Sequence, residues 1–242
     1  MPAVLVHGVP DTERVWHEVR QRLTRTDVIA LSLPGFNSEV PLGFGATKEE
    51  YLEWIIEQLE KLGEPVDLVG HDWVCILVMR VASLRLDLVR TWAAGSGPVS
   101  KNYEWHPLAK IWQTPGVGEQ WMANLDQDTF SQQLEAAGLP YRIATEVASR
   151  VEDRMKGCIL RLYRSAAHVG EEWQPDLEKI KAPGLVFWGA QDEACPERFG
   201  DELARDAGAD GLLKLDCGHW TQVSRAIEVA SALEQHWQEA KV

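Results

Sequence analysis

The sequence predicts an α/β fold in which about six mostly parallel strands are flanked by helices and interrupted by a helical insertion. Short apolar runs alternate with longer amphipathic stretches along most of the chain. Most of these runs are apolar on both faces, as parallel strands covered by helices on both sides must be. The stretch 98–175 contains no good strand, so we expect residues 1–97 and 176–242 to form one core and 98–175 a helical cap, or lid.

Six segments are the strand candidates, and helix candidates lie between them. The strands are AVLV (3–6), VIALSL (28–33), VDLVG (66–70), TWAAG (91–95), GLVFWG (184–189) and LLKLD (212–216). The clearest helix is 48–62, which has a capping box at Thr47 and Glu50 and a terminating Gly63. Similar patterns predict helices over 11–23, 73–86 and 221–236. This alternation favours a parallel sheet, and we expect all of its strands to be parallel.

Composition narrows the function classes. The net charge of −13 argues against nucleic acid or an anionic membrane surface as a partner. The four cysteines are far apart and form no CxxC or zinc-like spacing, so we expect reduced thiols in a cytoplasmic protein and no metal site. The first apolar run is too short for a signal peptide or a membrane span. No glycine-rich phosphate-binding signature is present, so no cofactor is expected.

Reactive residues follow four of the predicted strands, in VHGVP, GHDWV, GAQDEACP and CGHW. Ligands and catalytic groups in an open parallel sheet lie at these carboxyl ends of the strands. In GHDWV, a Gly-x-nucleophile sequence at a strand-to-helix turn is typical of a nucleophile elbow. The chain order nucleophile, acid, histidine fits Asp72, Asp192 and His219, with Glu193 as the rival for the acid.

An aspartate at the elbow implies a particular reaction. A carboxylate is already ionised at neutral pH, so Asp72 needs no base and attacks carbon by displacement, which forms an alkyl ester. His219, oriented by Asp192, then activates a water that hydrolyses the ester. The oxyanion of that step needs two backbone N–H groups, which we expect from Val9 and Trp73.

These motifs resemble the epoxide hydrolase and haloalkane dehalogenase branch of the α/β-hydrolase superfamily, and epoxide hydrolases most of all. HGVP resembles the branch's HGxP loop, whose proline is usually cis, and GHDW resembles its aspartate elbow. WQTPGVGEQ (112–120) and LRLYRS (160–165) resemble cap segments of epoxide hydrolases. The likeness covers most of the chain and implies the α/β-hydrolase fold, a small apolar epoxide as substrate and a vicinal diol as product.

The resemblance also implies two acids in the cap that hydrogen-bond the epoxide oxygen, because an alkoxide is a poor leaving group. Tyr163 stands where the family's second tyrosine stands. No tyrosine precedes the PG pair at the family's usual distance, so His106 is the candidate for the first acid, with Tyr103 in reserve. We expect the substrate pocket to include Pro10, Trp105, Trp112 and Trp220.

Two other functions remain open. A haloalkane-type dehalogenase would use the same Asp72, Asp192 and His219, with a halide held by Trp73 and by Trp105, Trp112 or Trp121. The first arginine after the elbow is Arg80, two helical turns on, which disfavours a small carboxylated substrate. A hydrolase-fold protein that binds a small ligand with little turnover is the second alternative.

Two departures from the family pattern raise structural questions. Val74-Cys75 replaces the small residues that normally follow the elbow, so either the helix stands further from the strand or smaller neighbours compensate. The HG pair lies at residues 7 and 8, which leaves room for one preceding strand where the family has more. The exposed sheet edge that results is expected to be covered by a second copy in a homodimer.

Overall fold

The computed structural model of the protein describes residues 1–240. Its six strands form one sheet in the order β2-β1-β3-β4-β5-β6, and every neighbouring pair is parallel. The strands are β1 (Ala3–Val6), β2 (Val28–Leu31), β3 (Val66–His71), β4 (Val89–Gly95), β5 (Gly184–Gly189) and β6 (Gly211–Leu215). The predicted parallel sheet of six strands is therefore confirmed.

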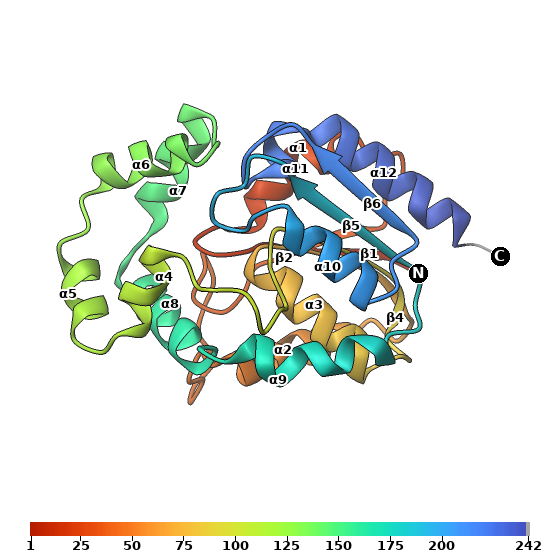
Figure 1. The fold of residues 1–242 in the computed structure, drawn as a ribbon, viewed down its shortest axis with the longest axis horizontal. Helices are drawn as coiled ribbons and strands as arrows, with labels where there is room; N and C mark the ends of the chain where they lie inside the picture. Colours follow the sequence, from red (N-terminus) through yellow and green to blue (C-terminus); the bar gives the residue numbers. More distant parts are fainter. Residues whose placement is uncertain (241–242) are drawn as a thin grey trace.

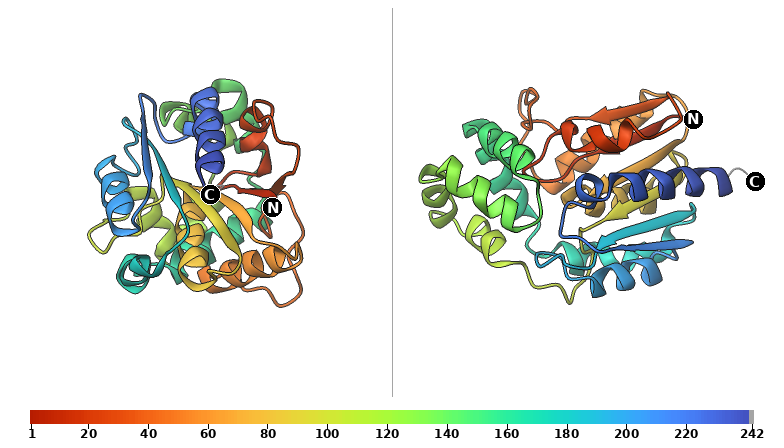
Figure 2. Two further views of the ribbon diagram at one scale, coloured as in Figure 1. Left: turned by 90° about the vertical axis from the view of Figure 1, so that its right-hand side faces the viewer. Right: turned by 90° about the horizontal axis from the view of Figure 1, so that it is seen from above.

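Helices cover both faces of the sheet (Figures 1 and 2). One face carries η1 (Glu13–Trp16), α1 (His17–Arg20), α11 (Thr221–Ser224) and α12 (Ala226–Glu239), which pack on one another. The other face carries α2 (Lys48–Glu60), α3 (Trp73–Leu84) and α10 (Arg198–Asp206). The helices predicted over 11–23 and 221–236 both lie on the first face, and each is divided into two pieces. Arg225, at φ −132°, interrupts the second of them while its guanidinium donates to the carbonyl of Asp216 at 2.6 Å.

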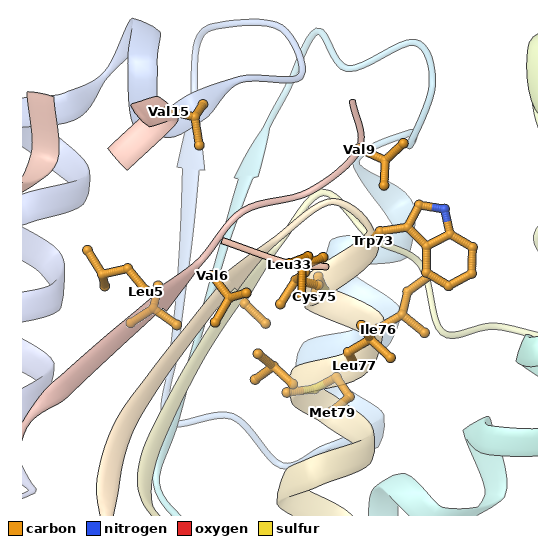
Figure 3. Close-up of a cluster of buried hydrophobic side chains, with 14 of the residues drawn as sticks. Leu5, Val6, Val9, Val15, Leu33, Trp73, Cys75, Ile76, Leu77 and Met79 are labelled. Carbon is orange, nitrogen blue, oxygen red and sulfur yellow. The ribbon is translucent and has the colours of Figure 1, made fainter. Parts of the chain in front are cut away.

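The helix after the elbow lies in the middle of the core. Leu77 and Met79 of α3 belong to the same buried cluster as Leu5 and Val6 of β1 (Figure 3). Helix α3 packs against both β3 and β4, so its position determines where the preceding turn lies relative to the sheet and in which direction that turn points.

Val74 does not push this helix away from the sheet. Its side chain is fully buried among apolar neighbours. A Cβ at Gly70 would lie 2.6 Å from the carbonyl oxygen of Val74, so strand and helix cross in close contact. The small residue that this crossing requires is Gly70, and Val74 is accommodated in the core beside it.

The segment between β4 and β5 is helical. It contains α4 (Pro107–Gln113), α5 (Val117–Ala123), α6 (Gln127–Ala136), α7 (Tyr141–Arg150), α8 (Asp153–Ser165), α9 (Val169–Trp173) and η2 (Gln174–Lys179). Helices α4 to α7 stand apart from the sheet at one end of the molecule (Figure 1). They face the carboxyl ends of the strands, where the four sequence motifs meet (Figure 2).

Two further findings concern the surface. Across residues 1–240, no helix is long and apolar enough to cross a membrane.

Strand β2 ends the sheet, pairs with β1 alone in the described part of the chain, and is half-buried along its length. The homodimer that would cover this edge stays a prediction, and light scattering at micromolar concentration checks it.

Candidate active site

The turn between β3 and α3 holds Asp72 in a strained conformation. Its φ of 56° and ψ of −126° lie where residues with a Cβ are rarely found. The turn is stabilised on both sides, because the amide of Asp72 donates to Gly95 O at 2.9 Å and its carbonyl accepts from Cys75 N at 2.9 Å. Such strain projects a side chain from the end of the strand, as a nucleophile elbow requires.

Three side chains from three strand ends meet at this turn. His219 Nδ1 lies 2.8 Å from Asp192 Oδ2, and His219 Nε2 lies 3.4 Å from Asp72 Oδ2. The second oxygen of Asp192 accepts the amide of Cys195 at 2.8 Å, which orients the carboxylate toward the ring. No hydrogen bond joins Glu193 to His219 in residues 1–240, so Asp192 is the acid that this geometry brings to the histidine.

Burial and the neighbouring charges shift the pKa values of His219 and Asp72 in opposite directions. Burial lowers the pKa of His219, but the Asp192 carboxylate and the Asp72 carboxylate outweigh it and hold that pKa well above its usual value. Burial raises the pKa of Asp72, and the hydrogen bond and charge of His219 reverse this, so the net shift is downward. Asp72 is therefore ionised at neutral pH.

The loop after β1 contacts one carboxylate oxygen of Asp72. Val9 N donates to Asp72 Oδ1 at 2.6 Å, and the following Val9–Pro10 peptide bond is cis. A Cβ at Gly8 would overlap the Asp72 side chain, so glycine is required for this close approach. Val9 and Trp73 lie close together above the end of α3 (Figure 3). The two oxygens of Asp72 thus have different neighbours, since Oδ1 accepts the N–H of Val9 and Oδ2 faces Nε2 of His219.

A cavity of about 510 Å³ opens over Asp72 between the core and the cap. All four residues expected to line a pocket, Pro10, Trp105, Trp112 and Trp220, line this cavity. Its remaining lining is mostly apolar or aromatic and contains no lysine or arginine. A small uncharged molecule suits such a site better than a carboxylate does.

The three cap candidates occupy different positions. Tyr163 is buried and lines the cavity, with its ring edge-on to Trp73 and Trp112 at 5.4 and 4.9 Å between centroids. His106 also lines the cavity, 6.5 Å from Tyr163 between ring centroids. Tyr103 donates its hydroxyl hydrogen to Ala194 O at 2.8 Å, so its donor is already used. The structure thus brings His106 and Tyr163 together at the wall of the cavity.

His71 contacts both the backbone and the ring of His219. Its Nε2 lies 2.8 Å from the carbonyl oxygen of His219, and the two rings pack edge-on at 4.8 Å between centroids. Burial lowers the pKa of His71 to about 4, so the ring is neutral and Nε2–H donates. The position of His71 in the GHDW motif is the only signal of this contact in the sequence.

Asp11 was not singled out from the sequence, although it directly follows the HGVP loop. Its side chain is fully buried, and Oδ2 accepts the indole N–H of Trp220 at 2.9 Å. Oδ1 has no hydrogen-bond partner within residues 1–240. Burial raises the pKa of Asp11 to about 7. Asp11 therefore connects the Val9 loop to the His219 loop and keeps its proton through most of the acid range.

Asp11 should make stability depend on pH. Because its folded pKa lies above the unfolded value, the folded state binds more protons between about pH 4 and 7, so the free energy of unfolding falls as pH rises through that window. The loss attributable to Asp11 is up to roughly 4 kcal/mol. Asp11→Asn, which keeps an acceptor for Trp220, should flatten this part of the curve. Urea unfolding from about pH 4 to pH 8 checks it, and an unchanged slope would contradict it.

A parallel sheet with a strained aspartate elbow, a buried Asp–His pair and a helical cap defines a hydrolase-like α/β protein. Comparison with known proteins agrees with this class. Residues 3–232 match the Alpha/beta hydrolase family, and the chain belongs to that family.

Individual relatives are distant. The chain is 25% identical to (E)-2-((N-methylformamido)methylene)succinate hydrolase of Acinetobacter baylyi over 85% of its own length and 78% of that protein. It is 24% identical to bifunctional epoxide hydrolase 2 of Rattus norvegicus over 96% of its own length, but spans 51% of the rat protein. Haloalkane dehalogenase DbeA from Bradyrhizobium elkani USDA94 has a similar structure, with a TM-score of 0.78 at 20% identity over 98% of this chain and 91% of that one. At such identity, structural similarity shows the fold alone.

Proposed function

We propose that the protein is an epoxide hydrolase that opens a small, uncharged epoxide to a vicinal diol through an alkyl ester of Asp72. One observation carries the choice of an epoxide. The backbone N–H of Ala109 donates to Nδ1 of His106, at 3.2 Å, because His106 caps the N-terminus of α4. Nδ1 is then an acceptor, and the hydrogen of the neutral ring must be on Nε2.

The cap therefore offers two hydrogen-bond donors to an oxygen in the cavity. Burial lowers the pKa of His106, which keeps the ring neutral and its Nε2–H in place. Burial also raises the pKa of Tyr163 well above its usual value, so its hydroxyl remains protonated. Two neutral donors on the cap and a carboxylate on the core fit an epoxide, whose oxygen gains charge while its carbon is attacked.

In the first step, Asp72 Oδ2 attacks one ring carbon and the carbon–oxygen bond of the epoxide breaks. The electron pair of that bond goes to the oxygen, which accepts a hydrogen bond from Nε2–H of His106 and takes the hydroxyl proton of Tyr163, leaving a phenolate. The product is an ester whose carbonyl oxygen is Oδ1, already hydrogen-bonded to Val9 N at 2.6 Å. No base is needed in this step, because the nucleophile is ionised.

In the second step, a water attacks the ester carbonyl carbon and His219 takes its proton at Nε2. The tetrahedral intermediate then collapses: the bond between the carbonyl carbon and Oδ2 breaks, and the leaving alkoxide takes the proton from the imidazolium to give the diol. The new carboxyl group of Asp72 loses its proton, which restores the hydroxyl of Tyr163 through solvent. Ester formation has removed the charge of Asp72, which was one of the two carboxylates that raised the pKa of His219. The pKa of His219 must fall when the ester forms, so the ring becomes a competent base when the reaction needs one. Asp192 stabilises the imidazolium, and the N–H groups of Val9 and Trp73 stabilise the oxyanion.

Product analysis tests this proposal. The protein is incubated separately with styrene-type epoxides and with haloalkanes of similar size. Diol release from the epoxides supports the proposal, and halide release without diol formation identifies a dehalogenase. Saturable binding of both compounds without product would identify the third alternative, a binding protein.

Tyr163→Phe separates the two reactions within one active site. The variant removes a proton donor to the epoxide oxygen and keeps the ring that packs on Trp73. We expect epoxide opening to slow by roughly a hundredfold, a typical contribution of general acid catalysis. Tyr103→Phe is the matched control, since that hydroxyl already donates its hydrogen to Ala194 O, and it should lose much less activity. Equal losses in the two variants would contradict the donor role of Tyr163.

A specific feature favours dehalogenation as the second candidate. The indole N–H groups of Trp73 and Trp112 are buried and have no hydrogen-bond partner in the described part of the chain. Both rings pack on Tyr163, so the two donors lie in the same region of the cavity. Trp105, by contrast, donates to Ala167 O at 3.2 Å. Two free N–H donors could hold a departing halide, and the halide assay above measures this activity.

A further inference from the structure

Cys195 lies beside the Asp192–His219 pair, although the sequence spacing of its cysteines predicted no metal site. One potential ligand atom from each of Asp192, Cys195 and His219 lies within 4.8 Å of the other two. All three residues are buried and line the cavity over Asp72. This arrangement brings together a carboxylate oxygen, a sulfur and an imidazole nitrogen, which are the three ligand types of protein zinc sites.

The position of the thiol is determined by hydrogen bonds to the backbone of Cys195. Its N–H donates to Asp192 Oδ1 at 2.8 Å, and its carbonyl accepts from Trp188 Nε1 at 2.7 Å. These contacts hold the loop that carries Cys195 against the end of β5. Zinc bonds to sulfur, nitrogen and oxygen are about 2.0 to 2.3 Å long, so one ion placed between the three side chains reaches all of them after small rotations. The cavity leaves a fourth position open.

We propose that Asp192, Cys195 and His219 form a binding site for a thiophilic divalent cation of the Zn²⁺ and Cd²⁺ class, and that the bound ion blocks the base function of His219. The ion takes the place of the hydrogen between Nδ1 of His219 and the Asp192 carboxylate. The thiol of Cys195 releases its proton to solvent as the sulfur–metal bond forms. A doubly protonated His219 ring releases its Nδ1 proton in the same way.

The consequence for His219 follows from its tautomer. Nδ1 gives its lone pair to the ion, so the one hydrogen of the neutral ring must be on Nε2. Nε2 is the atom that faces Asp72, at 3.4 Å, and with a hydrogen attached it donates instead of accepting. It can no longer take a proton from water.

Cadmium titration of the whole protein tests the site without relying on turnover. Thiolate bound to Cd²⁺ gives an ultraviolet charge-transfer band, which we expect to saturate at one ion per chain. Cys195→Ala should abolish the band and weaken Cd²⁺ binding by roughly a hundredfold or more, because a direct ligand is lost. Cys217→Ala is the matched control, since Cys217 is also buried but lies outside the cluster, and it should keep the band.

Absence of the band in the unmodified protein, or its survival in Cys195→Ala, overturns the proposal. If Cys195→Ala does not fold, Cys195→Ser serves the same purpose, because a hydroxyl gives no thiolate band.

The consequence for catalysis rests on the proposed function and is measured separately. Intact mass spectrometry with an epoxide and Zn²⁺ should show accumulated ester. Metal binding without ester formation would count against the proposed reaction and leave the metal site in place.

Discussion

Asp72→Ala should reduce epoxide turnover by about four orders of magnitude or more, because it removes the atom that forms the covalent bond. The residues around it remain, with Val9 N–H and His219 facing an empty space, so a substrate-sized ligand should still bind. Single-turnover kinetics measures the loss, and thermal melting shows whether the variant is folded. Turnover within tenfold of the unmodified protein would exclude Asp72 as the nucleophile.

Isotope transfer tests independently whether Asp72 forms the covalent ester. When excess protein reacts once in heavy-oxygen water, water attacks the ester carbonyl carbon and not the substrate carbon. The heavy oxygen should therefore enter the peptide that contains Asp72, and the diol from this first turnover should contain none. A first-turnover diol that carries heavy oxygen would mean that water attacks the epoxide directly, and the two-step mechanism would be wrong.

His219→Gln should stop the reaction after its first step. Ester formation needs no base, whereas ester hydrolysis depends on Nε2 of His219 as the acceptor of a proton from water. The variant should gain a mass equal to that of the epoxide, and loss of this adduct should be slower than turnover by about three orders of magnitude or more.

A double variant provides the control for this adduct. Asp72→Ala combined with His219→Gln should gain no mass under the same conditions, which assigns the bond to Asp72. An absence of adduct in His219→Gln under substrate excess, with the protein folded, would contradict the role of His219 in the second step.

Asp192→Asn should slow hydrolysis less than His219→Gln, since it disturbs the orientation of the base but leaves it present.

Most strands could be predicted because a buried parallel strand is a short apolar run with a distinct composition. Strand β4 is the instructive exception. It begins at Val89, two residues before the predicted TWAAG, because Arg90 interrupts the apolar pattern. Arg90 pairs with Asp67, a fully buried carboxylate on the neighbouring strand β3. A charge in a buried strand is stable when its partner is present, and that partner is distant in sequence.

The candidate site also has one part that the sequence predicts and another that only the structure shows. The elbow is a local feature, since Gly70, Asp72 and the apolar residues of α3 are close in sequence and their spacing is characteristic. The cap is different. His106 is a candidate by elimination until the structure shows that it caps α4 with Nδ1, and only this bond determines which nitrogen carries the hydrogen.

The sequence alone predicted the sheet and placed Asp72, Asp192 and His219 after three of its strands, in the chain order that the proposed reaction uses. Each depends on a short motif or a local periodicity. Tertiary structure alone decided that Asp11 meets Trp220 and that Cys195 lies beside His219. Those contacts join loops that follow different strands. Their distances depend on how the whole sheet twists and packs, so no short stretch of sequence contains them.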